Sequence, residues 1–233
     1  KATSTWTNIT PTGLDPRVPD IELSSTGRLH IVCGYYNTAA GSSGYRYTDN
    51  PATVTSSGWT SPATTFTTQY NVALASNGNT LYALPSGSTW NVTTMYKSTN
   101  GGANWSATGT TPAFTSSQAW YCMAVAVDPN NANNVIVGSL DCYKTTNGGT
   151  SWTKISNWVG TTGQYVHADQ QIITWRNNNV VLFGSDGGIH YSANGGTTIT
   201  DRNVGLRLKQ FYSVAIHPTS TNYFLAGAQD NGT

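Results

Sequence analysis

Apolar and polar residues along the chain recur as pairs of short apolar runs joined by a polar turn. The runs are rich in β-branched and aromatic residues, and the turns contain Gly, Pro, Asn or Asp, which is the pattern of a β-hairpin. Five such pairs cover residues 21–34, 72–84, 123–138, 172–184 and 214–227. No segment shows a sustained 3.6-residue period with helix caps, so the pattern predicts an all-β chain with almost no helix.

An eight-residue motif recurs between these hairpins at a fixed spacing. Its copies begin at residues 98, 145 and 192, which are 47 residues apart, and read Ser-Thr-Asn-Gly-Gly-Ala-Asn-Trp, Thr-Thr-Asn-Gly-Gly-Thr-Ser-Trp and Ser-Ala-Asn-Gly-Gly-Thr-Thr-Ile. A period of about 40–50 residues is typical of the four-stranded blade of a β-propeller. The spacing therefore predicts a propeller of four-stranded antiparallel blades, whereas a two-sheet sandwich needs no such period.

Each copy of the motif, here named the Asn-Gly-Gly turn, lies where the third strand of a blade reverses into the fourth. The Asn side chain can bond backbone amides ahead of it, and the glycines accept positive φ. The tryptophans would fill the gap between neighbouring blades. A calcium or sugar site at each turn is the less favoured alternative to this folding role. The residues expected to build the turns are Ser98, Asn100, Gly102 and Trp105, then Thr145, Asn147, Gly149 and Trp152, then Ser192, Asn194 and Gly196.

The two ends of the chain read as parts of blades. Residues 4–9 are similar to residues 150–155, which end a turn and begin a fourth strand. The pattern predicts part of one longer propeller, incomplete at both ends and accompanied by further blades and modules. The expected divisions are a last strand at 1–15, blades at 16–66, 67–115, 116–160 and 161–208, and the first half of a further blade at 209–233.

Charge is scarce in this chain. Charged residues make up 9% and the net charge is +1, against about 25% charged residues in an ordinary soluble domain. A surface of Thr, Ser, Asn and Gly is common in extracellular proteins, so a secreted or cell-surface location is expected. Without a Lys/Arg cluster, nucleic acid and anionic membranes are not expected partners, and no apolar run approaches the roughly 18 residues needed for membrane insertion.

The three cysteines have no metal-ligand spacing. They are Cys33, Cys122 and Cys142. Buried free thiols are favoured at the last two positions, and a disulfide between them stays open.

The turns also carry a family resemblance. Their pattern, Ser-x-Asn-x-Gly-x-x-Trp, resembles the Asp-box, or BNR, repeat of sialidase-like, xyloglucanase-like and sortilin-like propellers. It is most similar to secreted bacterial multi-repeat proteins labelled glycosyl hydrolase or BNR-repeat protein, through residues 167–171, 184–189, 210–212 and 229–233. The resemblance implies a secreted propeller, whereas hydrolase activity has to be argued from a site.

The topology of such a propeller places carboxylates, a histidine and aromatic residues on one face. The Asn-Gly-Gly turns lie on one face, and the loops before the first strand and after the second strand lie on the other, here named the loop face. Asp141, Asp186 and Asp230 each follow the glycine that ends a second strand, while His167 and Asp169 precede a first strand. Aromatic residues expected at equivalent places are Trp120, Tyr121, Tyr165 and Tyr212.

This collection of residues is typical of sugar binding. Aromatic rings stack on sugars, and glycoside cleavage needs two carboxyls about 5–5.5 Å apart for retention or 6.5–9.5 Å apart for inversion. Asp169, Asp186 and Asp230 are therefore the catalytic candidates. The alternative is that these carboxylates cap turns through Asx hydrogen bonds. No cofactor and no transition-metal site is predicted, although calcium near Asp169 or Asp186 stays open.

This sequence does not contain the full set of residues that a sialidase mechanism requires. Arg17-Val18-Pro19 resembles the Arg-Ile-Pro motif of that family, but Glu22 is the only glutamate and no arginine cluster is evident. The prediction is thus a propeller segment of a secreted bacterial protein that binds glycan or protein, without proven catalysis. The alternatives are a glycoside hydrolase acting on polysaccharide through paired Asp residues, and a structural spacer or cargo of a secretion machine.

Overall fold

The fold is described from a computed structural model, in which strands and turns are the only regular elements. Helices are absent from the residues whose positions the structure describes. These are residues 5–15, 17, 19–34, 44–63, 71–160, 163–177, 179–206 and 211–229.

The strands form five antiparallel sheets, here named blades 1 to 5, in which strands follow sequence order. Blade 1 contains β1 (Pro19–Leu23), β2 (Leu29–Cys33) and β3 (Gly44–Thr48). Blade 2 contains β4 (Asn71–Asn77), β5 (Thr80–Ser86), β6 (Thr94–Ser98) and β7 (Ser106–Thr110). Blade 3 contains β8 (Ala124–Asp128), β9 (Asn131–Gly138), β10 (Cys142–Thr145) and β11 (Thr153–Lys154). Blade 4 contains β12 (Gln170–Trp175), β13 (Val181–Ser185), β14 (Gly188–Ser192) and β15 (Thr200–Asp201). Blade 5 contains β16 (Phe211–His217) and β17 (Ser220–Ala228). The predicted all-β fold is confirmed.

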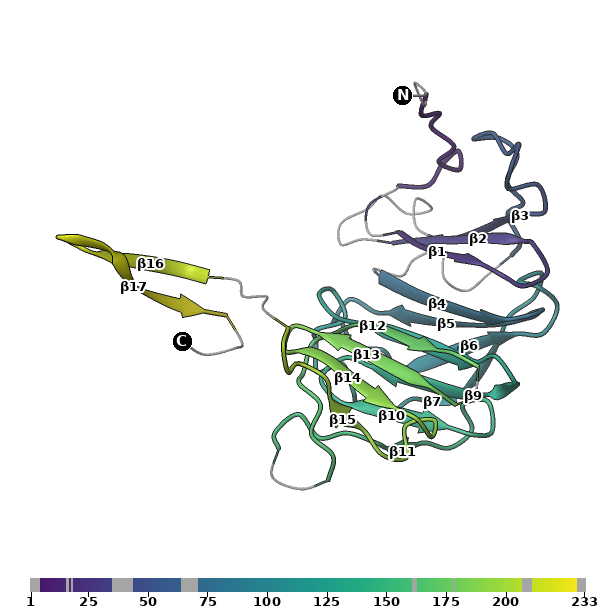
Figure 1. The fold of residues 1–233 in the computed structure, drawn as a ribbon. Coiled ribbons are helices and arrows are strands. Elements are labelled where there is room, and N and C mark those ends of the chain that lie inside the picture. The colour runs from purple at the N-terminus through teal and green to yellow at the C-terminus, as the bar shows by residue number, and fades with distance from the viewer. Residues whose placement is uncertain are drawn as a thin grey trace.

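Blades 1 to 4 pack side by side with their first strands together (Figure 1). β1 contacts β4, β4 contacts β8, and β8 contacts β12. Because side chains alternate between the faces of a strand, each inner blade supplies apolar residues to both of its neighbours. The core therefore lies between blades, as buried clusters that include Tyr45 with Leu74, Tyr82 with Val125, and Ile136 with Phe183.

The Asn-Gly-Gly turns are closed by side-chain hydrogen bonds. Ser98 Oγ donates to Asn100 Oδ1 (3.0 Å) and accepts from the Gly102 amide (2.9 Å), and Asn100 Oδ1 accepts from the Asn104 amide (2.9 Å). The same three bonds recur at 2.8–3.0 Å in the turns of blades 3 and 4. Each turn thus satisfies its own backbone donors.

The turns also join neighbouring blades. Gly102 packs directly on the buried ring of Tyr45 in blade 1. Trp105 donates from Nε1 to the Gly102 carbonyl (3.1 Å), and its ring meets Tyr45 edge-on at 5.2 Å. Between blades 3 and 4, Lys144 donates from Nζ to the Gly195 carbonyl (2.8 Å). The turns therefore stabilise the stack as well as the hairpins.

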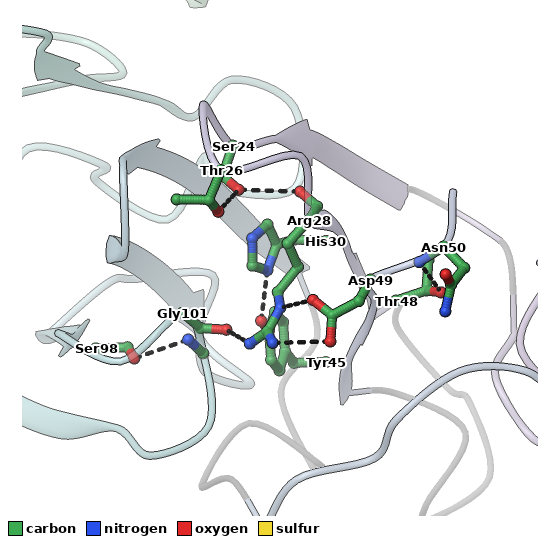
Figure 2. A network of polar contacts seen from close by, with 11 residues as sticks. Ser24, Thr26, Arg28, His30, Tyr45, Thr48, Asp49, Asn50, Ser98 and Gly101 are labelled. Carbon is green, nitrogen blue, oxygen red and sulfur yellow. Dashed lines mark hydrogen bonds and ion pairs between the residues drawn. The ribbon is translucent and has the colours of Figure 1, made fainter. Parts of the chain in front are cut away.

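Arg28 makes the same kind of joint between blades 1 and 2. Figure 2 shows its guanidinium between Asp49 of its own blade and the Gly101 carbonyl of the next turn. Nε and Nη2 bind the two Asp49 carboxylate oxygens (2.7 and 2.9 Å), while Nη1 donates to Gly101 (2.7 Å). In the same view, His30 Nδ1 lies 2.6 Å from the Tyr45 hydroxyl. A planar, bidentate donor suits this joint because it binds two blades at once.

One stability prediction follows for the turn of blade 3. Asn147→Ala is expected to lower the free energy of unfolding by about 1–2 kcal/mol, because its Oδ1 accepts from the Ser151 amide and from Thr145 Oγ1,. Urea unfolding followed by tryptophan fluorescence would measure the loss. Asn147→Asp keeps the acceptor oxygens and should lose under about 0.5 kcal/mol. Equal losses in the two variants would contradict a role for the acceptor.

Blade 5 differs from the others. Its two strands stand apart from blade 4 in Figure 1, and its large apolar side chains are exposed on both faces of the hairpin. These are Phe211, Tyr212, Val214, Ile216, Tyr223, Phe224 and Leu225.

Residues 5–15 contain no strand and pack against the loop that follows blade 1. The Thr12 amide donates to the Ser56 carbonyl (2.9 Å), Trp59 Nε1 donates to the Ile9 carbonyl (2.8 Å), and Leu14 is buried. A last strand of a preceding blade at this place stays a prediction, because no β-pairing partner for these residues is present among the described strands.

Candidate functional site

Four side chains meet on the loop face where blades 3 and 4 adjoin. Tyr121, in the connection before β8, donates its hydroxyl to Asp186 Oδ2, and Gln171 Nε2 of β12 donates to Asp186 Oδ1 (3.1 Å). The Trp120 ring lies 5.5 Å from the ring of Tyr121. We name Trp120, Tyr121, Gln171 and Asp186 the aromatic–carboxylate cluster. It joins two of the predicted aromatic residues to one of the predicted carboxylates.

The backbone before β8 explains why two aromatic rings face outward. The Tyr121 and Cys122 amides both donate to the Gln118 carbonyl (2.8 and 3.0 Å), which closes a tight turn. The turn buries Ala119 and Cys122 and leaves Trp120 57% exposed and Tyr121 exposed. The rings are thus presented by a hydrogen-bonded turn and not by an extended loop.

Asp169 lies in the same neighbourhood, against the buried thiol of Cys122. Its backbone has φ +63°, an uncommon conformation for a residue other than glycine,. The thiol donates to Asp169 Oδ1 at 3.5 Å and lies 3.1 Å from Ser139 Oγ. Burial, together with the negative charges of Asp169 and Asp186, raises the pKa of Cys122 to about 12. Asp169 and Asp186, two of the catalytic candidates, are thus hydrogen-bonded by the successive residues Cys122 and Tyr121 of one turn.

Three other candidates are placed differently. Asp141 forms an ion pair with Lys154 (2.7 Å) and accepts a hydrogen bond from the Trp158 amide (3.0 Å). It therefore fixes the position of the connection that follows β11. The ring of His167 lies against Gly187. Tyr165 is exposed and meets His190 edge-on at 6.1 Å.

Two further candidates concern blade 5. Tyr212 is exposed on the hairpin that stands apart from blade 4. Asp230 lies outside the described residues.

Comparison with known proteins gives the fold. No family model matches this chain and no curated protein matches it. Among solved structures, an ancestral GH74 enzyme has a TM-score of 0.51 and 16% identity, over 97% of this chain and 29% of that one. The extracellular domain of a putative one-component system from B. thetaiotaomicron has a TM-score of 0.50 and 11% identity, over 89% of this chain and 26% of that one. A GH74 enzyme from Niastella koreensis has a TM-score of 0.47 and 25% identity, over 74% of this chain and 22% of that one.

The first two of these likenesses support a β-propeller. The fold is an incomplete set of propeller blades. The chain spans less than a third of the length of each of these three proteins.

The axis of the propeller contains two carboxylates that are not part of the aromatic–carboxylate cluster. Asp20 Oδ2 accepts from the Leu74 amide (2.7 Å), and Glu22 Oε1 accepts from Ser76 Oγ (2.6 Å) and from the Ser76 amide (3.2 Å). Both residues line a cavity of about 430 Å³ whose walls are the first strands of the four blades, with Gln171 at β12. Burial raises the pKa of both carboxyls. They satisfy the amides at the open edge of β4, so Glu22 has a structural role here.

Gln171 is the cluster member that sequence reasoning did not select. It falls within the family-like segment 167–171, but only the pairing of β12 with β13 within blade 4 brings its side chain to Asp186. Arg17, the residue of the sialidase-like motif, forms an ion pair with Asp15 at 2.5 Å. No group of three His, Cys, Asp or Glu side chains is placed to hold a metal ion within the described part of the chain. That part also contains no helix able to cross a membrane.

Proposed function

We propose that this chain is part of an Asp-box propeller of a secreted bacterial protein, and that it binds a neutral glycan on its loop face. The turns at 47-residue spacing, with their repeated Ser/Thr and Asn hydrogen bonds, support the Asp-box assignment. The low fraction of charged residues supports an extracellular location. The likeness to glycoside hydrolases of family GH74 supports the fold and leaves the ligand to be argued from the site,.

The aromatic–carboxylate cluster carries this proposal. An exposed Trp120 offers a flat apolar face to the C–H groups of a sugar ring, and the neighbouring Tyr121 ring widens that face,. Asp186 is already oriented by two hydrogen bonds, so little side-chain freedom is lost when it accepts from a sugar hydroxyl,. The charged group of the cluster is the Asp186 carboxylate, which repels acidic sugars and so favours a neutral glycan.

A glycoside hydrolase is the second candidate, because the successive residues Tyr121 and Cys122 donate hydrogen bonds to Asp186 and Asp169, respectively. Binding is favoured over catalysis because both oxygens of Asp186 accept hydrogen bonds within the cluster. Asp169 in turn accepts from the Cys122 thiol. A spacer or cargo role would not require an exposed aromatic pair beside an oriented carboxylate.

The binding proposal predicts the effect of removing the indole. Trp120→Ala is expected to weaken glycan binding about tenfold or more, since aromatic residues at the centre of a binding surface dominate its affinity. A polysaccharide array, followed by calorimetry with the best binder, would measure the change. Trp6→Ala is the control, because Trp6 is almost fully exposed in residues 5–15, which pack on the loop after blade 1. Unchanged binding by Trp120→Ala would contradict the proposal.

Catalysis can be tested on the same glycans. We expect no release of reducing ends by the unaltered chain, and weaker binding by Asp186→Asn, because Asn replaces an acceptor oxygen by a donor group. Reducing-end release that disappears in both Asp169→Asn and Asp186→Asn would instead favour the hydrolase. In that case, the stereochemistry of the released sugar would report the separation of the two carboxyls.

A further inference from the structure

The hairpin of β16 and β17 leaves large apolar side chains exposed to solvent on both of its faces. Ile216 is 63% exposed and Phe224 is 64% exposed, on a two-stranded ribbon. A two-stranded hairpin alone is marginally stable in water, and a contiguous apolar surface of this kind marks a contact that is not made. We infer that this hairpin docks on the exposed face of blade 4 and brings Tyr212 to the glycan site, an inference that rests on the proposed function.

The register of blade 3 shows which face of the hairpin would dock. The hairpin of β8 and β9 and the hairpin of β16 and β17 each have a register shift beside the turn. Each also has a glycine at the same distance from that shift, Gly138 in β9 and Gly227 in β17. The equivalent pairs are Ala124–Gly138 with Ser213–Gly227, Val125–Val137 with Val214–Ala226, and Val127–Val135 with Ile216–Phe224. In blade 3 the last two pairs are buried against blade 2. Val214, Ile216 and Phe224 are therefore on the face that should contact the preceding blade, which is blade 4.

Blade 4 presents a matching surface. In blade 3, Ala124, Ala126 and Ile136 are buried in the cluster shared with blade 4. The equivalent residues of blade 4 are Ile172, Thr174 and Leu182, as the pairings of β12 with β13 show. Ile172 is 60% exposed, whereas its equivalent Ala124 is 5% exposed. The same position is thus covered in one blade and open in the next. An apolar side chain larger than alanine stands at the open position.

Docking would add an aromatic ring to the site. Tyr212 is equivalent in register to Met123 of blade 3 and Gln171 of blade 4. Met123 and Gln171 both line the axial cavity, and Gln171 also binds Asp186. A docked Tyr212 would take the next place around the axis, one blade beyond Gln171. Aromatic rings on either side of Asp186 suit an oligosaccharide chain better than a single sugar, because each ring can stack on a separate unit.

A cross-link tests docking without any ligand. A Cβ atom on Gly138 would lie 2.8 Å from Ile173 Cδ1 across the joint of blades 3 and 4. The equivalent positions at the joint of blades 4 and 5 are Gly184 and Val214. We expect the variant Gly184→Cys with Val214→Cys to form an intrachain link with a short bis-maleimide, which adds one thiol at each end. The matched control is Gly184→Cys with Ala215→Cys, since Ala215 is on the opposite face of β16.

The native thiols should not interfere. All three cysteines are free and buried, and burial raises the pKa of Cys33 to about 11 and of Cys142 to about 12. An intrachain link at least fivefold more abundant than in the control would support docking. Equal linking in the two variants, or linking only between two chains, would overturn it.

The linked protein then tests the role of Tyr212. Its binding to neutral hexasaccharides of glucose, xylose and mannose should fall about tenfold on Tyr212→Ala, while disaccharide binding should change less than twofold. Equal binding with and without Tyr212, or binding of no hexasaccharide, would overturn the contribution to the site even if the link forms. The proposed function is tested separately by Trp120→Ala in the unlinked chain, so the two failures are distinguishable.

Discussion

Gly102→Ala is expected to lower the free energy of unfolding by about 3 kcal/mol or more. Gly102 has φ +83°, a conformation that strains an L side chain, and its added Cβ would overlap the hydroxyl of Tyr45,. Tyr45 cannot move away without cost, because it is fully buried and its hydroxyl is bonded to His30. Overpacking and backbone strain therefore add at the joint of blades 1 and 2. Urea unfolding at neutral pH would measure the loss.

Gly13→Ala separates the two causes. Gly13 has the same φ of +83°, but an added Cβ would meet nothing within 4 Å. Its loss should be about 1 kcal/mol, which is the backbone contribution alone. If both variants lose the same amount, the close packing of the turn on blade 1 does not contribute to stability.

Acid is expected to destabilise the fold through His30. Burial, together with the nearby Arg28 guanidinium, lowers the pKa of this imidazole to about 4 from its usual 6.5. Between these values the unfolded chain binds a proton that the folded chain does not, so stability falls as pH decreases from about 6.5 to about 4. The contribution of His30 over this range is about 3 kcal/mol. Burial also lowers the pKa of His190, which acts with the same sign.

A difference measurement is needed because two carboxyls act in the opposite direction. Burial raises the pKa of Asp20 and Glu22. A carboxyl whose pKa is higher in the folded state than in the unfolded state lowers the stability of the fold as pH increases. Unfolding at pH 7 and pH 4 should therefore be compared between the unaltered chain and His30→Gln, which cannot titrate. The variant should lose most of the acid destabilisation assigned to His30, and His217→Gln, which removes an exposed imidazole, should not. An unchanged pH dependence in His30→Gln would contradict the assignment.

Much of the fold is predictable from local patterns in the sequence. The apolar run that contains Val125, Ala126 and Val127 predicts a strand, and the structure buries these residues against two different blades. The repeated Asn-Gly-Gly motif predicts reversals between strands, and the structure shows a closed turn at each. Such features depend on a few neighbouring residues, so one sequence suffices to find them.

The site was predictable only in part. Chain topology placed Tyr121 and Asp186 on one face, and the structure brings them into contact although 65 residues separate them. Topology placed Asp141 on that face as well, but an ion pair with Lys154 holds it at the edge of blade 3. Gln171 carried no signal of its own beyond its place in a family-like segment.

By itself, therefore, the sequence determined the strands, the turns, their order and the repeat that makes them blades, because backbone preferences and side-chain alternation act over a few residues. Only the tertiary structure decided which polar side chains meet. Tyr121 reaches Asp186, and Arg28 reaches Gly101, across joints between blades. Those contacts depend on how closely two blades pack, and that spacing is set by buried apolar residues far away in the sequence,.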